Sequence, residues 1–214
     1  MKALGAILLF AAAAYAQPDL SGVWVVSGSP DLAGEPSYNA EMMKIWQERK
    51  ANLGDQDPAG YCLPNGVVRV TTLPYKIVQT AKLVVILSEG NTHSFRRLFL
   101  DGRGHEHVEE VEPDSWTGHS IAKWEGDTLV VDTTGFNDRT WLDSTGKPHS
   151  DALHVVERYR RPGNARLEVE YTLEDPKALT KPFRFKRTFA LAPARELQEQ
   201  FCTDLNHLIP EKTR

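Results

Sequence analysis

The chain has 214 residues, a formal net charge of −4 and a hydrophobic content of 41%. That hydrophobic content is enough to build a core, so the composition excludes a chain that is disordered throughout. Acidic and basic residues are interspersed with a slight acidic excess, which leaves no basic field for nucleic acid. We therefore expect a globular protein without a nucleic-acid partner.

Residues 1–16 are typical of a secretory signal peptide. Lys2 supplies a positive charge, "ALGAILLFAAAA" an apolar run that is short for a membrane span, and "AYA" before Gln17 the small residues of a cleavage site. A buried N-terminal helix is disfavoured because the apolar residues show no amphipathic period. The sequence predicts a secreted or periplasmic protein without a membrane span, in which residues 17–214 form a single barrel domain.

The mature chain begins with a short predicted strand at residues 22–27 and then contains the one segment with helical spacing, residues 37–54. Gly54 offers a C-terminal stop for this helix. Residues 55–66 are rich in Asp, Pro and Gly, which is typical of a loop. The apolar residues that roughly follow the helical period are Met42, Met43, Ile45, Trp46 and Leu53.

From residue 66 onward the pattern is β. Short β-branched or aromatic runs, beginning with "GVVRVTTL" and "KIVQT", alternate with turn residues, and "ELQEQFC" is a candidate for the last strand. About nine or ten strands with mostly short connections predict an antiparallel meander, and closure into a barrel would remove its exposed edges. The predicted fold class is therefore mainly β, with an antiparallel meander that closes into a lipocalin-like barrel and one N-terminal helix.

The clearest hairpin is "GHSIAKWEGDTLVVDTTGFND", residues 118–138. A two-residue turn at 126–127 places Ile121 opposite Asp132. On one face of the hairpin, which is mixed in character, Asp132 then lies within diagonal reach of His119 and Lys123. The other face is predicted to be core and comprises Ser120, Ala122, Trp124, Leu129, Val131 and Thr133.

His119 and Asp132 are candidates for a general base and the acid that orients it. A carboxylate on the second nitrogen of an imidazole fixes the tautomer needed for proton transfer. The alternative is an exposed cross-strand pair that contributes little to stability.

A second candidate group lies in "HSDALHVVERY". His154 and Arg158 share one strand face, which suits an anionic or carbonyl ligand in a polar barrel interior or, alternatively, a face exposed to solvent. Glu157 lies on the other, apolar face and needs a cation, for which Arg187 or Arg97 is available. This pairing is as consistent with a structural role as with a catalytic one.

His105 and His107 would share a face on a strand and, with Glu109, could hold a divalent metal. A third ligand at fixed spacing is missing, and acidic loops that contain histidine are common, so we predict neither a metal nor another cofactor. A Gly-x-Ser-x-Gly nucleophile motif is also missing.

The loop that leaves the hairpin, "TTGFNDRTWLDSTGKP", carries two apolar side chains, Phe136 and Trp141. They are typical of a pocket mouth or lid, or they plug the end of the barrel. Asn137 and Asp138 are either ligand contacts or turn formers. The predicted ligand contacts are Arg158, Asn137, Phe136, Trp141 and Arg97.

Cys62 and Cys202 are 140 positions apart. An even number of cysteines in an exported chain favours a disulfide over two free thiols. Closing so long a loop stabilises the fold by about 4–5 kcal/mol in the chain-entropy model.

Two resemblances add to this interpretation. "LSGVW" at residues 20–24 resembles the Gly-x-Trp strand that opens lipocalins and related calycin barrels. The resemblance implies that Trp24 forms the barrel floor beneath a basic side chain, Arg187 or Arg184.

Residues 55–205 resemble, in order, a family of secreted bacterial proteins known mainly as uncharacterised, so this likeness implies no activity. It departs where "FCTDLNHLIP" replaces a Cys-His-Glu-Gly run, and His207 is therefore not equated with that histidine. The segments that carry it are "DPAGYCLPNGVVR", "LFLDGRGH", "GHSIAKWEGDTLVVDTTGFNDRTWLD", "HSDALHVVERYRR" and "LEDP".

The leading hypothesis is a barrel protein that binds a small, partly apolar molecule, whose acidic, hydroxyl or carbonyl group meets His119, His154 or Arg158. The alternative is a cofactor-independent hydrolase, lyase or isomerase, with one of these histidines as general base and Asp132 or Glu157 as its partner. A third possibility is a module that binds another protein of the cell envelope.

Overall fold

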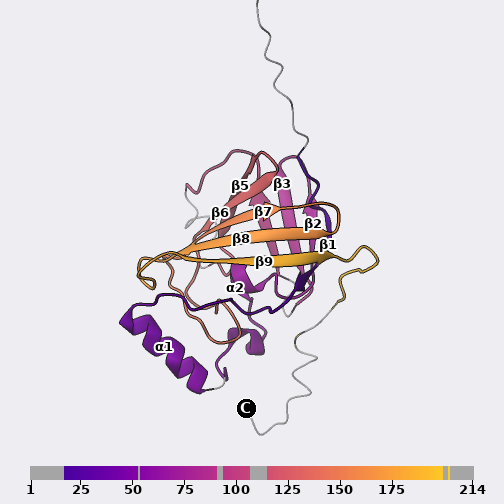
Figure 1. The fold of residues 1–214 in the computed structure, drawn as a ribbon. Coiled ribbons are helices and arrows are strands. Elements are labelled where there is room, and N and C mark those ends of the chain that lie inside the picture. Colours follow the sequence, from indigo (N-terminus) through magenta and orange to yellow (C-terminus); the bar gives the residue numbers. More distant parts are fainter. Residues whose placement is uncertain (1–16, 53, 91–93, 107–114, 200–201, 203–214) are drawn as a thin grey trace, which may run out of the picture.

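A computed structural model describes residues 17–52, 54–90, 94–106, 115–199 and 202, so the predicted signal peptide lies outside the described residues. Nine strands form one closed barrel in chain order, which confirms the prediction of a mainly β protein (Figure 1). The strands are β1 Gly22–Ser27, β2 Tyr75–Gln79, β3 Leu83–Ser88, β4 Phe95–Phe99, β5 His119–Glu125, β6 Thr128–Thr134, β7 His154–Arg160, β8 Arg166–Glu174 and β9 Phe183–Leu191.

One pair of neighbouring strands departs from the predicted meander. β4 and β5 are parallel, whereas the other neighbouring strands of the barrel are antiparallel. Parallel neighbours begin at the same end of a sheet, so their connection must return to that end. The prediction of an entirely antiparallel meander was therefore wrong at this pair, which is joined by a long connection, residues 100–118, instead of a short turn.

The predicted N-terminal helix is confirmed as α1, Ala40–Ala51. The side chain of Asn39 accepts a hydrogen bond from the Met42 amide at 2.9 Å, which caps the first turn. Trp46 is the buried residue of this helix, and its indole donates to the Thr145 carbonyl at 3.1 Å. α1 therefore packs against the loop that follows β6, outside the barrel (Figure 1).

Two segments predicted as strands differ in the residues that the structure describes. "GVVRVTTL" contains the short helix α2, Gly66–Arg69, which follows the 3-10 helix η1, Pro58–Tyr61. Val67 and Val68 are buried in the core, so tertiary packing overrides their preference for strands. In "ELQEQFC", the described residues 196–199 are not in a strand.

The predicted hairpin register is confirmed. Ile121 pairs with Asp132 across β5 and β6, and Gly126, with φ +63°, lies in the turn. Because strand side chains alternate, one set of residues points inward and the other points outward. The inward set packs with the rest of the core, which includes Trp24, Ile77, Val84, Ile86, Leu98, Leu129, Val131, Val155, Leu167 and Phe189.

Trp24 is fully buried and donates through its indole to the Leu20 carbonyl at 2.9 Å. Its cation partner is Arg161, whose guanidinium lies 5.3 Å from the ring centre. The prediction of Arg187 or Arg184 was wrong, because the Arg187 guanidinium lies over Tyr171 and Phe185 instead.

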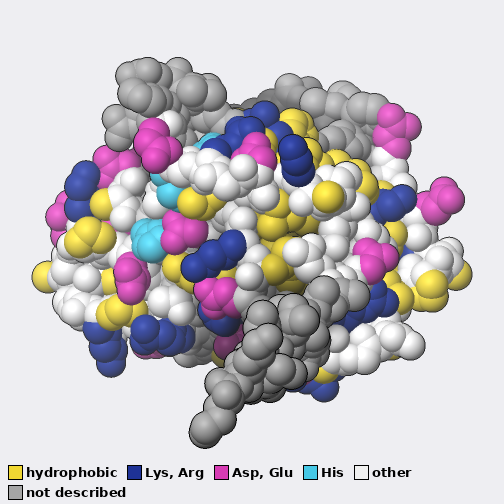
Figure 2. All heavy atoms as spheres, turned by 90° about the horizontal axis from the view of Figure 1, so that it is seen from above, with side chains coloured by type: hydrophobic (Ala, Val, Ile, Leu, Met, Phe, Trp, Pro, Cys, Tyr) yellow, Lys and Arg dark blue, Asp and Glu magenta, His cyan; other side chains and the backbone are white. Residues whose placement is uncertain are grey.

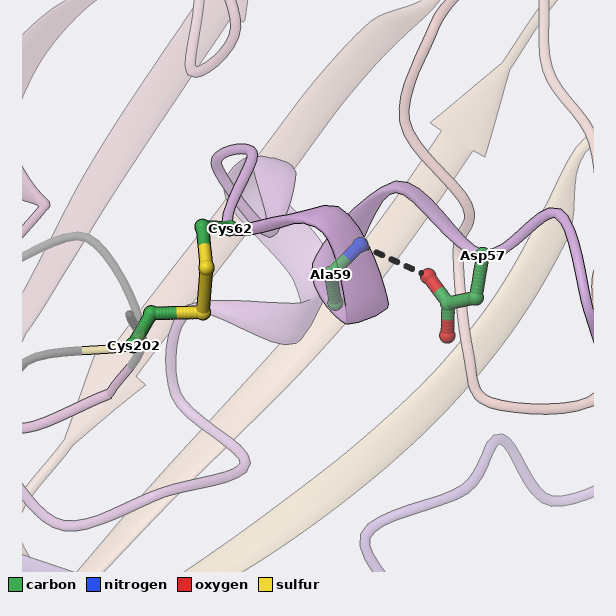
Figure 3. The surroundings of a disulfide bond; sticks show 4 residues. All are labelled: Asp57, Ala59, Cys62 and Cys202. Atoms are coloured by element: carbon green, nitrogen blue, oxygen red, sulfur yellow. Dashed lines mark hydrogen bonds between the residues drawn. A yellow bond between two sulfur atoms is a disulfide. The ribbon is translucent and has the colours of Figure 1, made fainter. Parts of the chain in front are cut away.

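The predicted disulfide is confirmed. Cys62 and Cys202 form a bond that joins the segment after η1 to the C-terminal segment (Figure 3). Asp57 caps η1 by accepting from the Ala59 amide at 3.0 Å and also binds both terminal nitrogens of Arg69. In the part of the chain that the structure describes, no helix is long and apolar enough to cross a membrane.

We predict that the double substitution Cys62→Ala and Cys202→Ala lowers the free energy of unfolding by about 5 kcal/mol, because the unfolded chain regains the entropy of a long loop. Urea denaturation of the oxidised protein and of the variant would measure this difference. Reductant should lower the stability of the oxidised protein and leave the variant unchanged. Equal stabilities of the protein and the variant without reductant would contradict the prediction.

Candidate functional site

A cluster of imidazoles surrounds Asp132 on the outer wall of the barrel. Asp132 on β6 accepts from His154 Nε2 on β7 at 3.0 Å through Oδ2. Its Oδ1 accepts from His105 Nε2 at 2.9 Å, and His105 comes from the segment after β4. One carboxylate therefore holds two imidazoles, one on each oxygen.

His119 joins this cluster through His105 and not directly through Asp132. The Nδ1 atoms of His105 and His119 are 3.0 Å apart. Because His105 uses its Nε2 proton toward Asp132, the neutral ring accepts at Nδ1, and His119 then donates its Nδ1 proton. The predicted contact between His119 and Asp132 is thus replaced by a chain in which His105 is the middle member.

His119 is largely buried and its ring stacks on Phe99, with ring centres 5.4 Å apart. Burial lowers the pKa of His119, and His105 and Arg103 lower that pKa further. The imidazole is therefore kept neutral near pH 7, in the form that accepts a proton or a hydrogen bond.

A groove of about 480 Å³ opens on the outer wall beside this cluster. Ile121 and Val130 give it an apolar floor, and the segment after β4 forms one side. His105 and Asp132 bring the imidazole–carboxylate pair to its edge. Figure 2, which views one face of the molecule, shows histidine side chains next to acidic ones. The remaining lining residues are Gly102, Arg103, Ala122, Lys123 and Glu125.

His107 and Glu109, the other members of the metal hypothesis, lie outside the described residues. Within the described ranges, no three His, Cys, Asp or Glu side chains are grouped so that they could hold a metal ion.

Glu157 is not part of this cluster, because it points into the barrel and is fully buried. Its partner is Arg96, whose terminal nitrogens donate to the two carboxylate oxygens at 3.0 and 2.6 Å. The prediction of Arg97 or Arg187 as partner was wrong: Arg97 points outward, and Arg187 donates to backbone carbonyls. The structure thus separates Glu157 from the three histidines by the barrel wall.

The buried ion pair has further partners inside the barrel. Tyr159 donates to Glu157 at 2.8 Å, and Arg96 donates to Ser120 at 3.2 Å and to Thr133 at 3.4 Å. Burial alone would lower the pKa of Arg96, but the Glu157 carboxylate raises that pKa above its ordinary value. These contacts stabilise the interior, and they lie away from the outer groove.

The predicted ligand contacts are scattered. Arg158 lies on the outer wall and pairs with Glu125 at 3.0 Å, and Arg97 lies over the ring of Phe99. Phe136, Asn137 and Trp141 are buried, each 6% exposed or less.

The loop that carries these three residues is held by internal contacts. Asp143 accepts from Lys147 at 2.6 Å and from the Leu32 amide at 3.3 Å. His149 accepts from Thr140 at 2.6 Å and donates to the Ser150 carbonyl at 2.9 Å. Such a network favours the alternative interpretation, in which Phe136 and Trp141 pack into the molecule, over a mobile lid.

We predict that Glu157→Gln lowers the free energy of unfolding by about 3–5 kcal/mol, because it leaves the Arg96 charge buried without its counter-ion. Urea denaturation would measure the loss. The control is Glu125→Gln, which breaks exposed pairs with Lys123 and Arg158 and should cost less than about 1 kcal/mol. Similar losses of unfolding free energy in both variants would contradict the prediction that the Arg96–Glu157 pair is important for stability.

We predict that His119 titrates below the ordinary histidine pKa of about 6.5. The unfolded chain then binds more protons than the folded one between the two pKa values, so stability falls as the pH falls through that window. Proton NMR of the imidazoles would measure the pKa. Arg103→Gln should raise it, because a neighbouring positive charge is removed, whereas the control Arg158→Gln should not. A pKa at or above 6.5 would contradict the prediction.

Comparisons with protein-family models, with curated proteins and with solved structures gave no match to this chain. Its function is therefore inferred from the geometry of the described residues alone.

Proposed function

We propose that the protein binds a small, partly apolar molecule in the groove on the outer wall of its barrel. One observation carries this proposal: His105 and Asp132 bring an imidazole and a carboxylate to the edge of a groove whose floor is Ile121 and Val130. Binding sites commonly combine an apolar lining with a few fixed polar groups that orient the ligand. The ligand would place its apolar part on the floor and a hydroxyl, carbonyl or acidic group at the polar edge.

The groove replaces the barrel mouth as the proposed ligand site. Residues expected at the mouth, Phe136 and Trp141, are buried in the packed loop. The polar edge, by contrast, stays accessible, since the Asp132 side chain is 40% exposed. A ligand therefore reaches the His105–Asp132 pair without displacing core residues.

A cofactor-independent hydrolase, lyase or isomerase is the second candidate, and the His119–His105–Asp132 chain favours it. In this chain His119 donates to His105 and His105 donates to the Asp132 carboxylate, so the neutral His119 ring has an unprotonated Nε2. A neutral imidazole oriented in this way suits a general base. His119 would be that base, with His105 and Asp132 as its orienting partners.

We also propose that the protein is exported, that it belongs to the secreted bacterial family it resembles, and that its barrel is related to lipocalins. The disulfide supports export, because such bonds persist in oxidising compartments. The Gly-x-Trp strand supports the lipocalin relation, since Trp24 is buried beneath a cation.

To test binding, we would use 8-anilino-1-naphthalenesulfonate, an aromatic anion, as the probe. Ile121→Glu places a carboxylate on the groove floor, which removes apolar contact and repels the sulfonate, and should weaken binding of the probe at least tenfold, about 1.4 kcal/mol. The matched control is Val78→Glu, at an outward apolar position on β2 that does not line the groove. Fluorescence titration would measure both affinities. Equal affinities for the two variants and the parent protein would contradict the groove as ligand site.

To test catalysis, we would follow the hydrolysis of p-nitrophenyl acetate across pH 5–9. If the protein is such an enzyme, His119→Ala and His105→Ala should each reduce the rate of hydrolysis at least tenfold, in the range expected for loss of a general base. His154→Gln serves as the control, because it leaves the His119–His105–Asp132 chain intact. Unchanged rates in all three variants would rule out this base while leaving the binding proposal in place.

A further inference from the structure

The interior of the barrel carries more positive than negative charge. Among the inward-facing strand residues that the structure describes, those with a full charge are Arg96, Glu157 and Arg187. Arg96 and Glu157 neutralise each other. Arg187 is 5% exposed and has no carboxylate partner among the described residues. One formal positive charge is therefore in excess in a region where an uncompensated charge is costly.

Two backbone carbonyls satisfy only part of the Arg187 guanidinium. Its terminal nitrogens donate to the carbonyls of Val68, in α2, and of Pro30, the latter at 2.6 Å. Carbonyl oxygens provide partial negative charge but no counter-ion. The Nε–H of Arg187 is buried and has no hydrogen-bond partner within the described ranges.

A second donor without a partner lies near Arg187. Tyr75 is fully buried and points inward from β2, and its hydroxyl has no hydrogen-bond partner in the part of the chain that the structure describes. Burial raises the pKa of the Tyr75 hydroxyl. The nearby Tyr171 and Glu157 raise this pKa further, whereas Arg187 lowers it. The phenol therefore stays protonated and is available as a donor. Geometry places the two side chains close together: the Tyr75 ring packs edge-on against Phe189, and Arg187 is the neighbouring inward residue on β9.

The buried side-chain atoms without a partner are mostly donors. Among the described residues, this set contains Arg187 Nε, the Tyr75 hydroxyl and Arg96 Nε, together with one acceptor, Asn65 Oδ1, which precedes α2. Buried donors without acceptors are rare in folded proteins and point to an unseen acceptor. Here the unpaired donors coincide with the excess positive charge.

We propose that the barrel interior binds a small monovalent anion of the chloride, nitrate or formate class beside Arg187 and Tyr75. A single negative charge matches the excess, and such an ion only accepts hydrogen bonds. The tight packing of Phe189 against Tyr75, with ring centres 5.1 Å apart, favours a small ion over a larger ligand. Buried water would satisfy the donors but would leave the charge uncompensated. This site lies inside the wall and is independent of the outer groove.

The test is the midpoint of thermal unfolding of the full mature chain in sodium chloride, nitrate or formate, at constant sodium concentration. Sodium gluconate, whose anion is too large for the interior, replaces the small anions to keep the ionic strength constant. A ligand that binds only the folded state raises the midpoint as its concentration rises. We expect this rise with the small anions and none with gluconate.

Substitutions locate the effect. Tyr75→Phe removes one donor and should raise the anion concentration needed for a given midpoint shift about tenfold, and Arg187→Met should abolish the shift. The matched control is Tyr38→Phe, which loses a buried hydroxyl that donates to Pro148 at 2.8 Å outside the barrel and should keep the anion response. Identical midpoints in chloride and gluconate, or an unchanged response in Tyr75→Phe, would mean interior water only and overturn the proposal. If Arg187→Met does not fold, Tyr75→Phe decides.

Discussion

A bidentate ion pair between Arg96 and Glu157 sets conditions that the rest of the barrel has to meet. Two charges removed from water are tolerated only when each has an opposite partner and additional hydrogen bonds. Tyr159 next to Glu157, and Ser120 and Thr133 beside Arg96, complete that environment. These residues lie on β4, β5, β6 and β7, so a shift of one residue in any of these strands would turn a needed group outward. The ion pair thereby ties the register of four neighbouring strands to one another.

Because side chains alternate along a strand, β6 and β7 each carry structural polar groups inside the barrel and accessible polar groups outside it. β7 directs Glu157 into the barrel and His154 outward, and β6 directs Thr133 inward and Asp132 outward. The inner groups satisfy one another and support the fold, whereas the outer groups face a groove that a ligand can enter. Rigid strands thus support an accessible cluster that only His105, from a connecting segment, has to complete.

Turn geometry and the alternation of side chains along a strand predicted the features of the barrel that involve residues close in sequence. The two-residue turn gave the β5–β6 register, and alternation grouped His119 with Asp132 on one face of the hairpin. Whether that face and the face of His154 point inward or outward was settled only by the structure. Contacts between distant segments were not predictable from the sequence: His105 reaches the site because β4 and β5 are parallel, and Arg96 is distinguished from its neighbour only by the strand register. The helix α2 was missed because the valines of "GVVR" favour strands in isolation, but burial decided their conformation.

Barrel closure depends on a pairing between the two ends of the folded chain. β1 pairs with β9, so residues near position 24 find their last neighbours near position 190. A contact of such sequence separation forms late, because the entropy of closing a long loop must be overcome first. During synthesis, β1 therefore has an open edge until β9 has been made, and an interrupted chain would present two unpaired edges to other chains. The closed barrel has no such edges, but its incomplete precursors do. Rapid completion of the chain or a partner that covers the open edges would therefore protect the precursors from aggregation.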